Sequence, residues 1–336
     1  MAPLEETLSA EEIAGAQESL RQLATGYQAS RALHTAVRLD VFSALDETAM
    51  TAAELSSRLH SDSYATELLL STLVAMGLVE KNQDSFVNSA IGKILLTKDS
   101  NWYQGQFINL IADTWEPWER LEDTVRKGGP VGIPPLFNND KVRAMRDTAS
   151  VIAPLLVSAL DLSRVRRVLE LGGGPASYAL AIAQAAPETE VTVMEFTQAS
   201  SITRDAVAAS GLGNRVRVDS GDYLMRDLGR EAYDLILFSD VLGSVPRDTA
   251  RDLLKRSHAA LVSEGRCVVH EFLLRDDRTG PLPCTLYALQ LLLGSENSHA
   301  WSGWEVTDAM QSQGFIRIQV IPLQPTLRSL IVGCRP

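Results

Sequence analysis

Acidic residues and glycines recur where apolar stretches end in the second half of the chain. An apolar run over residues 165–171 carries Glu170 and is followed by three glycines at positions 172–174. Glycines let backbone N–H groups approach a ligand closely, and the helical pattern that follows directs its N-terminus to the same place. The dinucleotide fingerprint GxGxxG needs a glycine at position 177, which is Ser177. The stretch predicts a turn that binds a ligand other than a pyrophosphate, with a turn that binds nothing as the alternative.

Polar residues also end the next two apolar runs. Glu195 lies at the end of the run 190–196, and Gly221-Asp222-Tyr223 follows the run 215–219. The carboxyl ends of parallel strands form the ligand-binding edge of a sheet. A carboxylate at position 195 can accept both ribose hydroxyls of an adenosine, while Asp222 can accept from the adenine amino group and Tyr223 can stack on the ring. Three such groups in order predict a nucleoside site.

The residues that carry this chemistry need a sheet to align them. Apolar runs alternate with helical patterns, which indicates a βαβ series and a parallel sheet with helices on both faces. The expected strands cover 165–171, 190–196, 215–219, 233–239 and 266–273, and the expected helices cover 176–186, 198–210, 247–262 and about 284–293. Two further runs, 315–321 and 327–332, predict a terminal hairpin that adds an antiparallel strand.

The first hundred residues have a different pattern. Capping boxes at Ser9–Glu12 and Thr51–Glu54 open helices, a Leu-rich helix covers about 63–76, and a β-hairpin joins 78–81 to 85–87. Helices followed by a hairpin form the winged-helix pattern, which often reads DNA. Residues 1–100 contain seven Lys and Arg against fourteen Asp and Glu, a balance of −7. DNA readers need cations, so we expect a homodimer interface instead.

Composition limits the remaining classes. The chain has 336 residues and a net charge of −11, which predicts two domains and disfavours nucleic acid or an anionic membrane as a partner. Its three cysteines lack CxxC spacing, which predicts a reducing compartment and no structural zinc. The acidic first twelve residues predict no signal peptide, and no apolar run is long enough for a membrane span. We therefore expect a cytoplasmic protein.

Taken together, these motifs resemble the class I S-adenosylmethionine-dependent small-molecule O-methyltransferases that carry an N-terminal winged-helix dimerisation domain. The resemblance covers nearly the whole chain. It implies an α/β, Rossmann-like class I methyltransferase domain, with a parallel sheet and a terminal antiparallel hairpin, preceded by a mostly helical winged-helix dimerisation domain. The domains expected are 1–100 for dimerisation, 101–150 as a helical linker that contributes to the substrate pocket, and 151–336 for binding S-adenosyl-L-methionine.

The resemblance also implies a set of site residues. The cofactor-binding residues expected are Glu170, Gly172, Gly173, Gly174, Glu195, Phe196, Gly221, Asp222, Tyr223 and Ser239. The substrate pocket is expected to include Tyr103, Phe107, Trp115, Met145, Asp240 and His299. The clustered aromatics have core packing as their alternative role. No metal site is expected.

One position departs from the family pattern. Many members have a histidine after the fourth strand that acts as general base, and the matching residue here is Gly243. His270 and His299 are the candidate replacements, each with a structural role as the alternative. Orientation alone supplies roughly 7–11 kcal/mol in favourable cases, whereas a base adds about 10²–10⁴-fold, so a base is optional for an acidic acceptor. The function predicted is O-methylation of an aromatic or polyketide-like molecule; the alternatives are C-methylation and a non-methylating reaction.

Overall fold

The computed structural model describes residues 8–46, 48–132 and 139–336, and its internal contacts divide it into two compact units, Met1–Ala112 and Asp113–Pro336. The N-terminal segment predicted to lack a signal peptide begins outside the described residues. The expected division was 1–100, 101–150 and 151–336. The units differ from it because helix α9 (Asn139–Ser158) crosses position 150 and buries Ile152 and Leu156 in the core of the second unit.

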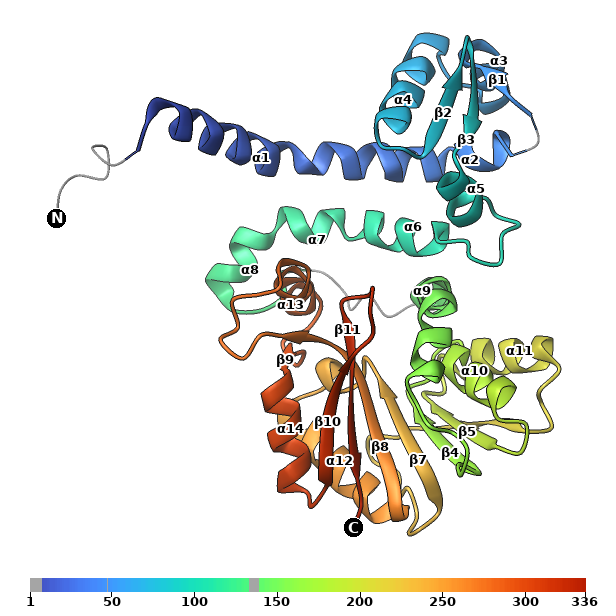
Figure 1. The fold of residues 1–336 in the computed structure, drawn as a ribbon, viewed down its shortest axis with the longest axis vertical. Helices are drawn as coiled ribbons and strands as arrows, with labels where there is room; N and C mark the ends of the chain where they lie inside the picture. The colour runs from blue at the N-terminus through green and yellow to red at the C-terminus, as the bar shows by residue number, and fades with distance from the viewer. Residues whose placement is uncertain (1–7, 47, 133–138) are drawn as a thin grey trace. The chain divides into compact units, whose positions relative to one another are not determined.

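The first unit is mostly helical and has a small sheet (Figure 1). Its helices are α1 (Ala10–Arg38), α2 (Val41–Ala44), α3 (Ala52–Leu59), α4 (Ser63–Ala75), α5 (Ala90–Leu96) and α6 (Gly105–Asp113). Its strands, in the order β1-β3-β2, are β1 (Met50–Thr51), β3 (Ser85–Asn88) and β2 (Val79–Asn82). Both predicted capping boxes are present, and β2 and β3 form the predicted hairpin.

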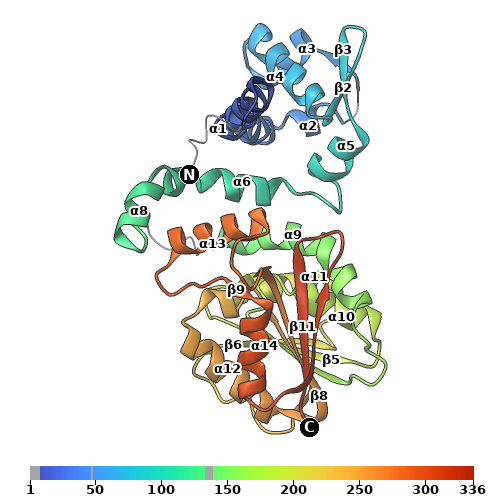
Figure 2. The ribbon, with the colours of Figure 1, turned by 60° about the vertical axis from the view of Figure 1, so that its left-hand side comes forward.

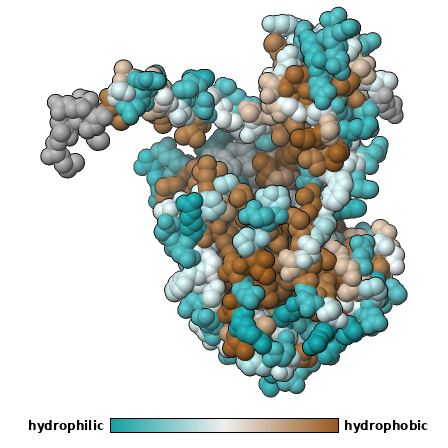
Figure 3. All heavy atoms as spheres, viewed as in Figure 1, coloured by the Kyte–Doolittle hydropathy of each residue, from teal (hydrophilic) through white to brown (hydrophobic). Residues whose placement is uncertain are grey.

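Only the last part of α1 is packed within this unit. Its buried residues are His34, Ala36 and Val37, while the 29-residue helix begins at Ala10. Figure 3 shows hydrophobic as well as hydrophilic side chains exposed along this helix. A helix of that length spans about 43 Å, and its residues 10–30 are exposed except for Thr25, which is partly buried.

The second unit is an α/β domain built on one large sheet. The strand order is β10-β11-β8-β7-β4-β5-β6, parallel from β8 to β6, with β11 antiparallel to both β8 and β10. The strands are β4 (Arg167–Leu171), β5 (Glu190–Glu195), β6 (Val216–Ser220), β7 (Tyr233–Ser239), β8 (Leu261–Leu274), β10 (Ile316–Pro322) and β11 (Arg328–Cys334), and the short β9 (Trp301–Ser302) pairs with the end of β8. The predicted parallel sheet with a terminal antiparallel hairpin is confirmed.

Helices cover both faces of this sheet, with α10 and α11 on one face and α12 and α14 on the other (Figures 1 and 2). Alternate strand residues enter two cores: Val168 and Leu237 join α9 and α10, whereas Leu169 and Phe238 join α12 and α14. The helices of the unit are α7 (Trp115–Glu119), α8 (Leu121–Lys127), α9, α10 (Ser177–Ala185), α11 (Ser200–Ser210), α12 (Arg247–Ala260), α13 (Leu282–Gly294) and α14 (Gly303–Ser312). Burial of both faces leaves the strand ends as the places where polar groups can face a ligand.

Candidate functional site

The glycine turn joins the end of β4 to α10. Gly172 and Gly174 have φ angles of +67° and +51°, a left-handed conformation in which a Cβ is unfavourable. Gly173 is required for a different reason, because a Cβ there would lie 2.5 Å from the Val193 Cγ1 atom. The three predicted glycines therefore each have a structural cause, and together they leave the turn without side chains.

Glu195 lies against this turn. The carboxyl group accepts hydrogen bonds from the Gly174 N–H at 2.6 Å and from the Phe196 N–H at 2.7 Å. The residue is only 4% exposed, and burial raises the pKa of its carboxyl, while the two backbone donors lower it. Because β4 and β5 are neighbouring parallel strands, the acid predicted for the ribose and the predicted glycine turn lie together.

Glu170 lies beneath the turn and has one unused oxygen. Its Oε2 atom accepts from the Ala179 N–H at 3.0 Å, whereas Oε1 is buried with no hydrogen-bond partner among the described residues. Burial, with a smaller effect of the nearby Glu195, raises the pKa of this carboxyl to about 8. Glu170 is therefore mainly protonated at neutral pH, which limits the repulsion between the two acids.

The third predicted motif follows β6. The Gly221 N–H donates to the Glu195 carbonyl at 2.9 Å, and the exposed Asp222 accepts from the Leu224 N–H through Oδ1. Tyr223 is 6% exposed and its ring packs on Phe196, with 4.5 Å between centroids and 38° between planes. The structure thus places the ends of β4, β5 and β6 side by side, with two aromatic rings next to the acid.

We expect the stability of the protein to fall as pH rises from 6.5 to 8. The pKa values of Glu170 and Glu271 are raised to about 8, so their stabilising contribution is complete below the unfolded value of 4.5 and is lost as pH rises toward 8. His270, whose pKa is lowered to about 3, has the opposite effect, which ends at its unfolded value of 6.5. Between pH 6.5 and pH 8, the ionisation of Glu170 alone should lower the free energy of unfolding by about 2 kcal/mol.

Urea unfolding of the ligand-free protein at pH 6.5 and pH 8 measures this effect. The Glu170→Gln and Glu271→Gln variants should each show a smaller pH dependence than the native chain. Glu188→Gln is the control, because that side chain is 76% exposed and should leave the dependence unchanged. Equal pH dependence in all four proteins would contradict the prediction.

A second polar cluster lies at the ends of β7 and β8. The Ser239 hydroxyl is 2.8 Å from His270 Nδ1, and the Tyr178 ring meets the imidazole edge-on with 5.3 Å between centroids. His270 is fully buried, and burial, followed by the nearby Arg328, lowers its pKa to about 3. The imidazole is therefore neutral at physiological pH. The structure brings the predicted residues Ser239 and His270 into direct contact.

Gly243 lies in the 3₁₀ turn η2 (Leu242–Ser244) after β7, facing a buried carboxyl. Its N–H donates to Glu271 Oε1 at 3.2 Å, and its carbonyl accepts from the His299 N–H at 2.8 Å. Burial, followed by the nearby Asp240, raises the pKa of Glu271 to about 8. His299 is partly exposed, and burial together with Arg247 and Arg278 lowers its pKa. Of the two predicted histidines, His299 is the one whose backbone contacts Gly243, and its role as a base stays a prediction.

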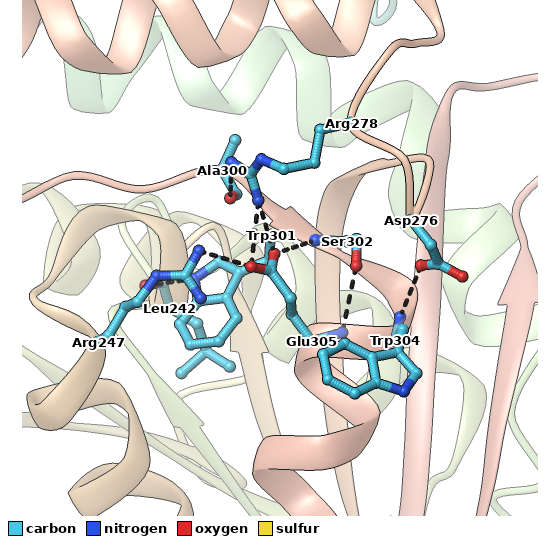
Figure 4. A network of polar contacts seen from close by, with 9 residues as sticks. All are labelled: Leu242, Arg247, Asp276, Arg278, Ala300, Trp301, Ser302, Trp304 and Glu305. Carbon is cyan, nitrogen blue, oxygen red and sulfur yellow. Dashed lines mark hydrogen bonds and ion pairs between the residues drawn. The ribbon is translucent and has the colours of Figure 1, made fainter.

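A network of polar contacts supports this segment (Figure 4). The Trp301 indole N–H donates to the Leu242 carbonyl at 3.1 Å, and Arg247 stacks over the indole at 4.6 Å. Glu305 pairs with Arg247 at 2.8 Å and with Arg278 at 3.0 Å, while it also completes the capping box of α14. The network fixes β9, and through it the position of His299 against η2.

An ion pair that the sequence does not reveal lies in the same region. Arg328, the first residue of β11, contacts Asp240 with 2.6 Å between Nη1 and Oδ1, and the arginine is 7% exposed. Asp240 has a left-handed backbone with a φ of 56°. The position of Asp240 at a strand end identified it as a candidate site residue. Its partner Arg328 lies 88 residues further along the chain, and no motif around Arg328 signals the pair. Glu271, also missed, carries the weaker signal of an acid at a strand end.

The predicted pocket residues fall in both units. Met145, on α9, lies close to the glycine turn, with its Cε atom 3.6 Å from the place where a Gly174 Cβ would be. Trp115 lies on α7, and α7 is tied to α13 by a 2.6 Å hydrogen bond from the Trp118 indole to Gln290. Tyr103 and Phe107 belong to the first unit. Their role as a pocket wall stays a prediction.

The strand order and the three strand ends around the glycine turn define a class of protein that binds a nucleoside cofactor at the edge of a mixed sheet. Family models identify it: an O-methyltransferase domain matches residues 132–316, and an O-methyltransferase dimerisation domain matches residues 21–98. The chain belongs to the O-methyltransferase family. The predicted family, its α/β fold class and its enzyme class, an S-adenosylmethionine-dependent methyltransferase, are confirmed.

Individual relatives match along almost the full length. The chain is 25% identical to a 3-hydroxy-5-methyl-1-naphthoate 3-O-methyltransferase of Streptomyces sahachiroi, covering 94% of each chain. It is similar to the solved structure of PigF with SAH, with 26% identity, a TM-score of 0.82 and coverage of 94% and 99%. Human N-acetylserotonin methyltransferase has the same fold, with a TM-score of 0.86 at 24% identity and coverage of 95% and 97%.

In the part of the chain that the structure describes, no helix is both long enough and apolar enough to cross a bilayer.

Proposed function

We propose that this enzyme transfers a methyl group from S-adenosylmethionine to a hydroxyl group of an aromatic or polyketide-like small molecule. The observation that carries the proposal is the meeting of Glu195 with the glycine turn: a buried carboxyl accepts the Gly174 N–H at 2.6 Å, next to the Phe196 and Tyr223 rings. These groups fit a ribose and an adenine, and family membership supplies the reaction class.

The residues at the turn fit the rest of the cofactor as well. The unpartnered, buried Oε1 of Glu170 suits an ammonium group, such as that of the methionine portion, whose positive charge would favour the ionised form of this carboxyl. Gly172 and Gly174 leave the approach to the backbone free of side chains, and Ser239 lies at the end of the adjacent β7. Glu195 would accept the ribose hydroxyls, and Asp222 would accept the adenine amino group.

When bound, S-adenosylmethionine supplies a methyl group on a positively charged sulfur that leaves readily. The chain's own task is to align the acceptor hydroxyl with that methyl group and to exclude water, and orientation of this kind supplies roughly 7–11 kcal/mol in favourable cases. The acceptor's proton must then pass to the protein or to solvent. Of the two predicted bases, partly exposed His299 is better supported than His270, which is fully enclosed and has a pKa near 3.

A homodimer formed through the first unit is part of this proposal. The dimerisation model covers residues 21–98, and α1 exposes Ile13, Leu20, Leu23 and Tyr27, each between 52% and 74%. Their intervals of seven, three and four residues place them on one side of the helix. An exposed apolar row on a helix whose buried residues, His34, Ala36 and Val37, all lie near its C-terminal end suits the same helix of a second copy.

Incubation with cofactor carrying a labelled methyl group and a panel of phenols tests the reaction. We expect label in a methyl ether of at least one hydroxylated aromatic acceptor. Label found on carbon would support C-methylation instead, and label that never leaves the cofactor across the panel would support a non-methylating reaction. The site of methylation is read from the ¹³C chemical shift of the labelled methyl group, which differs clearly between a methyl ether and a methyl group on carbon.

The cofactor assignment has its own test. The Asp222→Ala variant should bind S-adenosylmethionine about 10-fold more weakly, because one hydrogen bond to a charged acceptor contributes about 1.5 kcal/mol or more. Titration calorimetry measures the change. Asp248→Ala on α12 is the matched control, since that side chain is 97% exposed and its ion pair is with Arg251 of the same helix. Equal affinities of the two variants would remove Asp222 from the site.

A further inference from the structure

Arg328 is a buried cation that the fold alone does not explain. It begins β11, is 7% exposed, and pairs through Nη1 with Asp240 at 2.6 Å. Its guanidinium also stacks over the Phe272 ring at 4.1 Å, and that ring packs on Tyr287 with 4.8 Å between centroids. A buried ion pair recovers its desolvation cost only when the remaining donors are also satisfied.

Those remaining donors are not all used within the protein. The Nε atom of Arg328 is buried with no hydrogen-bond partner among the described residues. Because Asp240 takes Nη1, the edge formed by Nε and Nη2 is left, and this edge matches the two oxygens of a carboxylate. A buried donor without a partner is costly, and a ligand with two anionic oxygens would remove that cost.

The charges around the pair favour an anion. The Asp240 carboxylate interacts electrostatically with a second cation, Lys141 of α9, as well as with Arg328. The other acid beside it, Glu271, has its pKa raised to about 8 by burial and is therefore mainly neutral at pH 7, as is His270. Tyr178 and Tyr287, which also lie within electrostatic range of the guanidinium, are neutral because burial raises the pKa of each phenol.

The location is that of an acceptor site. Asp240, Glu271 and Arg328 stand at the same edge of the sheet, at the ends of β7 and β8 and the start of β11, and β4 with its glycine turn is the neighbour of β7. Three strand spacings, about 14 Å, separate β4 from β11. The Asp240 backbone, held at a φ of 56°, is the kind of strained position that gathers at functional sites.

We propose that the Nε–Nη2 edge of Arg328, oriented by Asp240, binds a carboxylate group of the methyl acceptor. The substrate class is therefore a hydroxylated aromatic or polyketide-like acid, with the carboxylate held at the β11 side while its hydroxyl is directed at the cofactor. This inference rests on the proposed methyltransferase function. A purely structural ion pair, which ties β11 to β7, is the alternative that the experiment must exclude.

Two measurements with paired acceptors test the proposal. The first is calorimetric binding of 6-hydroxy-2-naphthoate, whose carboxylate and hydroxyl lie at opposite ends of the ring system, and of its methyl ester to the complex with S-adenosylhomocysteine, which needs no turnover. The second is kcat/KM for methylation of both compounds. We expect the acid to be preferred in each, and the preference to fall about 10- to 100-fold in Arg328→Gln, which loses the charge-assisted pair. Arg251→Gln, on the surface of α12, should keep the native preference.

Folding of each variant is checked by its thermal midpoint. Arg328→Lys is a second variant that tests the carboxylate site. Lysine retains the charge beside Asp240 but lacks the forked edge, so it too should lose the preference for the acid. An unchanged preference in either folded variant, or no preference in the native enzyme, would overturn the proposal. If naphthoate binds through Arg328 but no acceptor is methylated, the proposed function fails while the carboxylate site stands.

Discussion

The Glu195→Ala variant is expected to bind S-adenosylmethionine with a dissociation constant about 10²–10⁴-fold higher than that of the native enzyme. Two hydrogen bonds from ribose hydroxyls to a buried carboxylate contribute about 1.5–3 kcal/mol each, and the alanine removes both. The carboxyl also accepts the Gly174 and Phe196 N–H groups, so its loss frees the turn that must meet the methionine portion. This double role makes the effect larger than that expected for Asp222.

Titration calorimetry with S-adenosylhomocysteine measures the effect, and the thermal midpoint separates it from unfolding. Glu190→Ala is a matched control, because that glutamate lies on the same strand at the opposite, exposed end. Glu195→Gln should fall between the native chain and Glu195→Ala, since an amide keeps one acceptor oxygen but directs an NH₂ group at a backbone donor. A folded Glu195→Ala protein whose affinity is within threefold of the native value would show that the carboxylate does not hold the cofactor.

The glycine turn and the strand ends that we propose to hold the cofactor were predictable as structural elements because their signals are local. Continuous apolar runs, which form strands buried on both faces, end next to Glu170, at Glu195 and before Asp222, and neighbouring parallel strands bring such ends together. The left-handed φ angles at Gly172 and Gly174 likewise require glycine in the sequence itself. Strand limits were reproduced to within a few residues, except that β8 begins at Leu261, where a helix was expected to continue.

The acceptor side was less accessible to sequence reasoning. Arg328 follows a loop, and nothing near it in the sequence signals that its partner is Asp240, 88 residues earlier. The buried state of His270 was equally hidden, because a histidine in a strand can face either a cleft or a core. It faces Ser239 and Tyr178, and their close packing explains its low pKa. Such facts depend on tertiary packing, which motif spacing does not encode.

Gly243 stands where the family resemblance leads us to expect a histidine, and the groups around it show what surrounds that position. The backbone N–H of this glycine contacts Glu271, and a Cβ at this position would lie 3.1 Å from the His299 carbonyl oxygen and 3.5 Å from Glu271 Oε2. The space where a side chain would stand is therefore bounded by a mainly protonated acid and by the chain that carries His299. Methyl transfer that depends mostly on orientation therefore stays a proposal for this enzyme.

The Gly173→Ala variant is expected to lose both stability and cofactor affinity. Gly173 is the one glycine of the turn without a left-handed backbone. Its Cβ would lie 2.5 Å from Val193 Cγ1 and 3.0 Å from the Glu170 carboxyl, both in the buried layer under the turn. Overpacking of this kind costs about 1–3 kcal/mol, so Gly173→Ala should lower the thermal midpoint by roughly 3–10 °C and weaken cofactor binding as the turn shifts.

A compensating change separates steric crowding from other causes. Val193→Ala removes the methyl group that a new Cβ would strike, so the Gly173→Ala/Val193→Ala double variant should be more stable than the sum of the single changes predicts, by about 1 kcal/mol or more. Gly213→Ala is the control, because its Cβ would meet nothing within 4 Å. Additive single effects would mean that Val193 does not demand a glycine at position 173. The Glu170 carboxyl, 3.0 Å from the same Cβ position, would then be the remaining steric reason for the middle glycine of the turn.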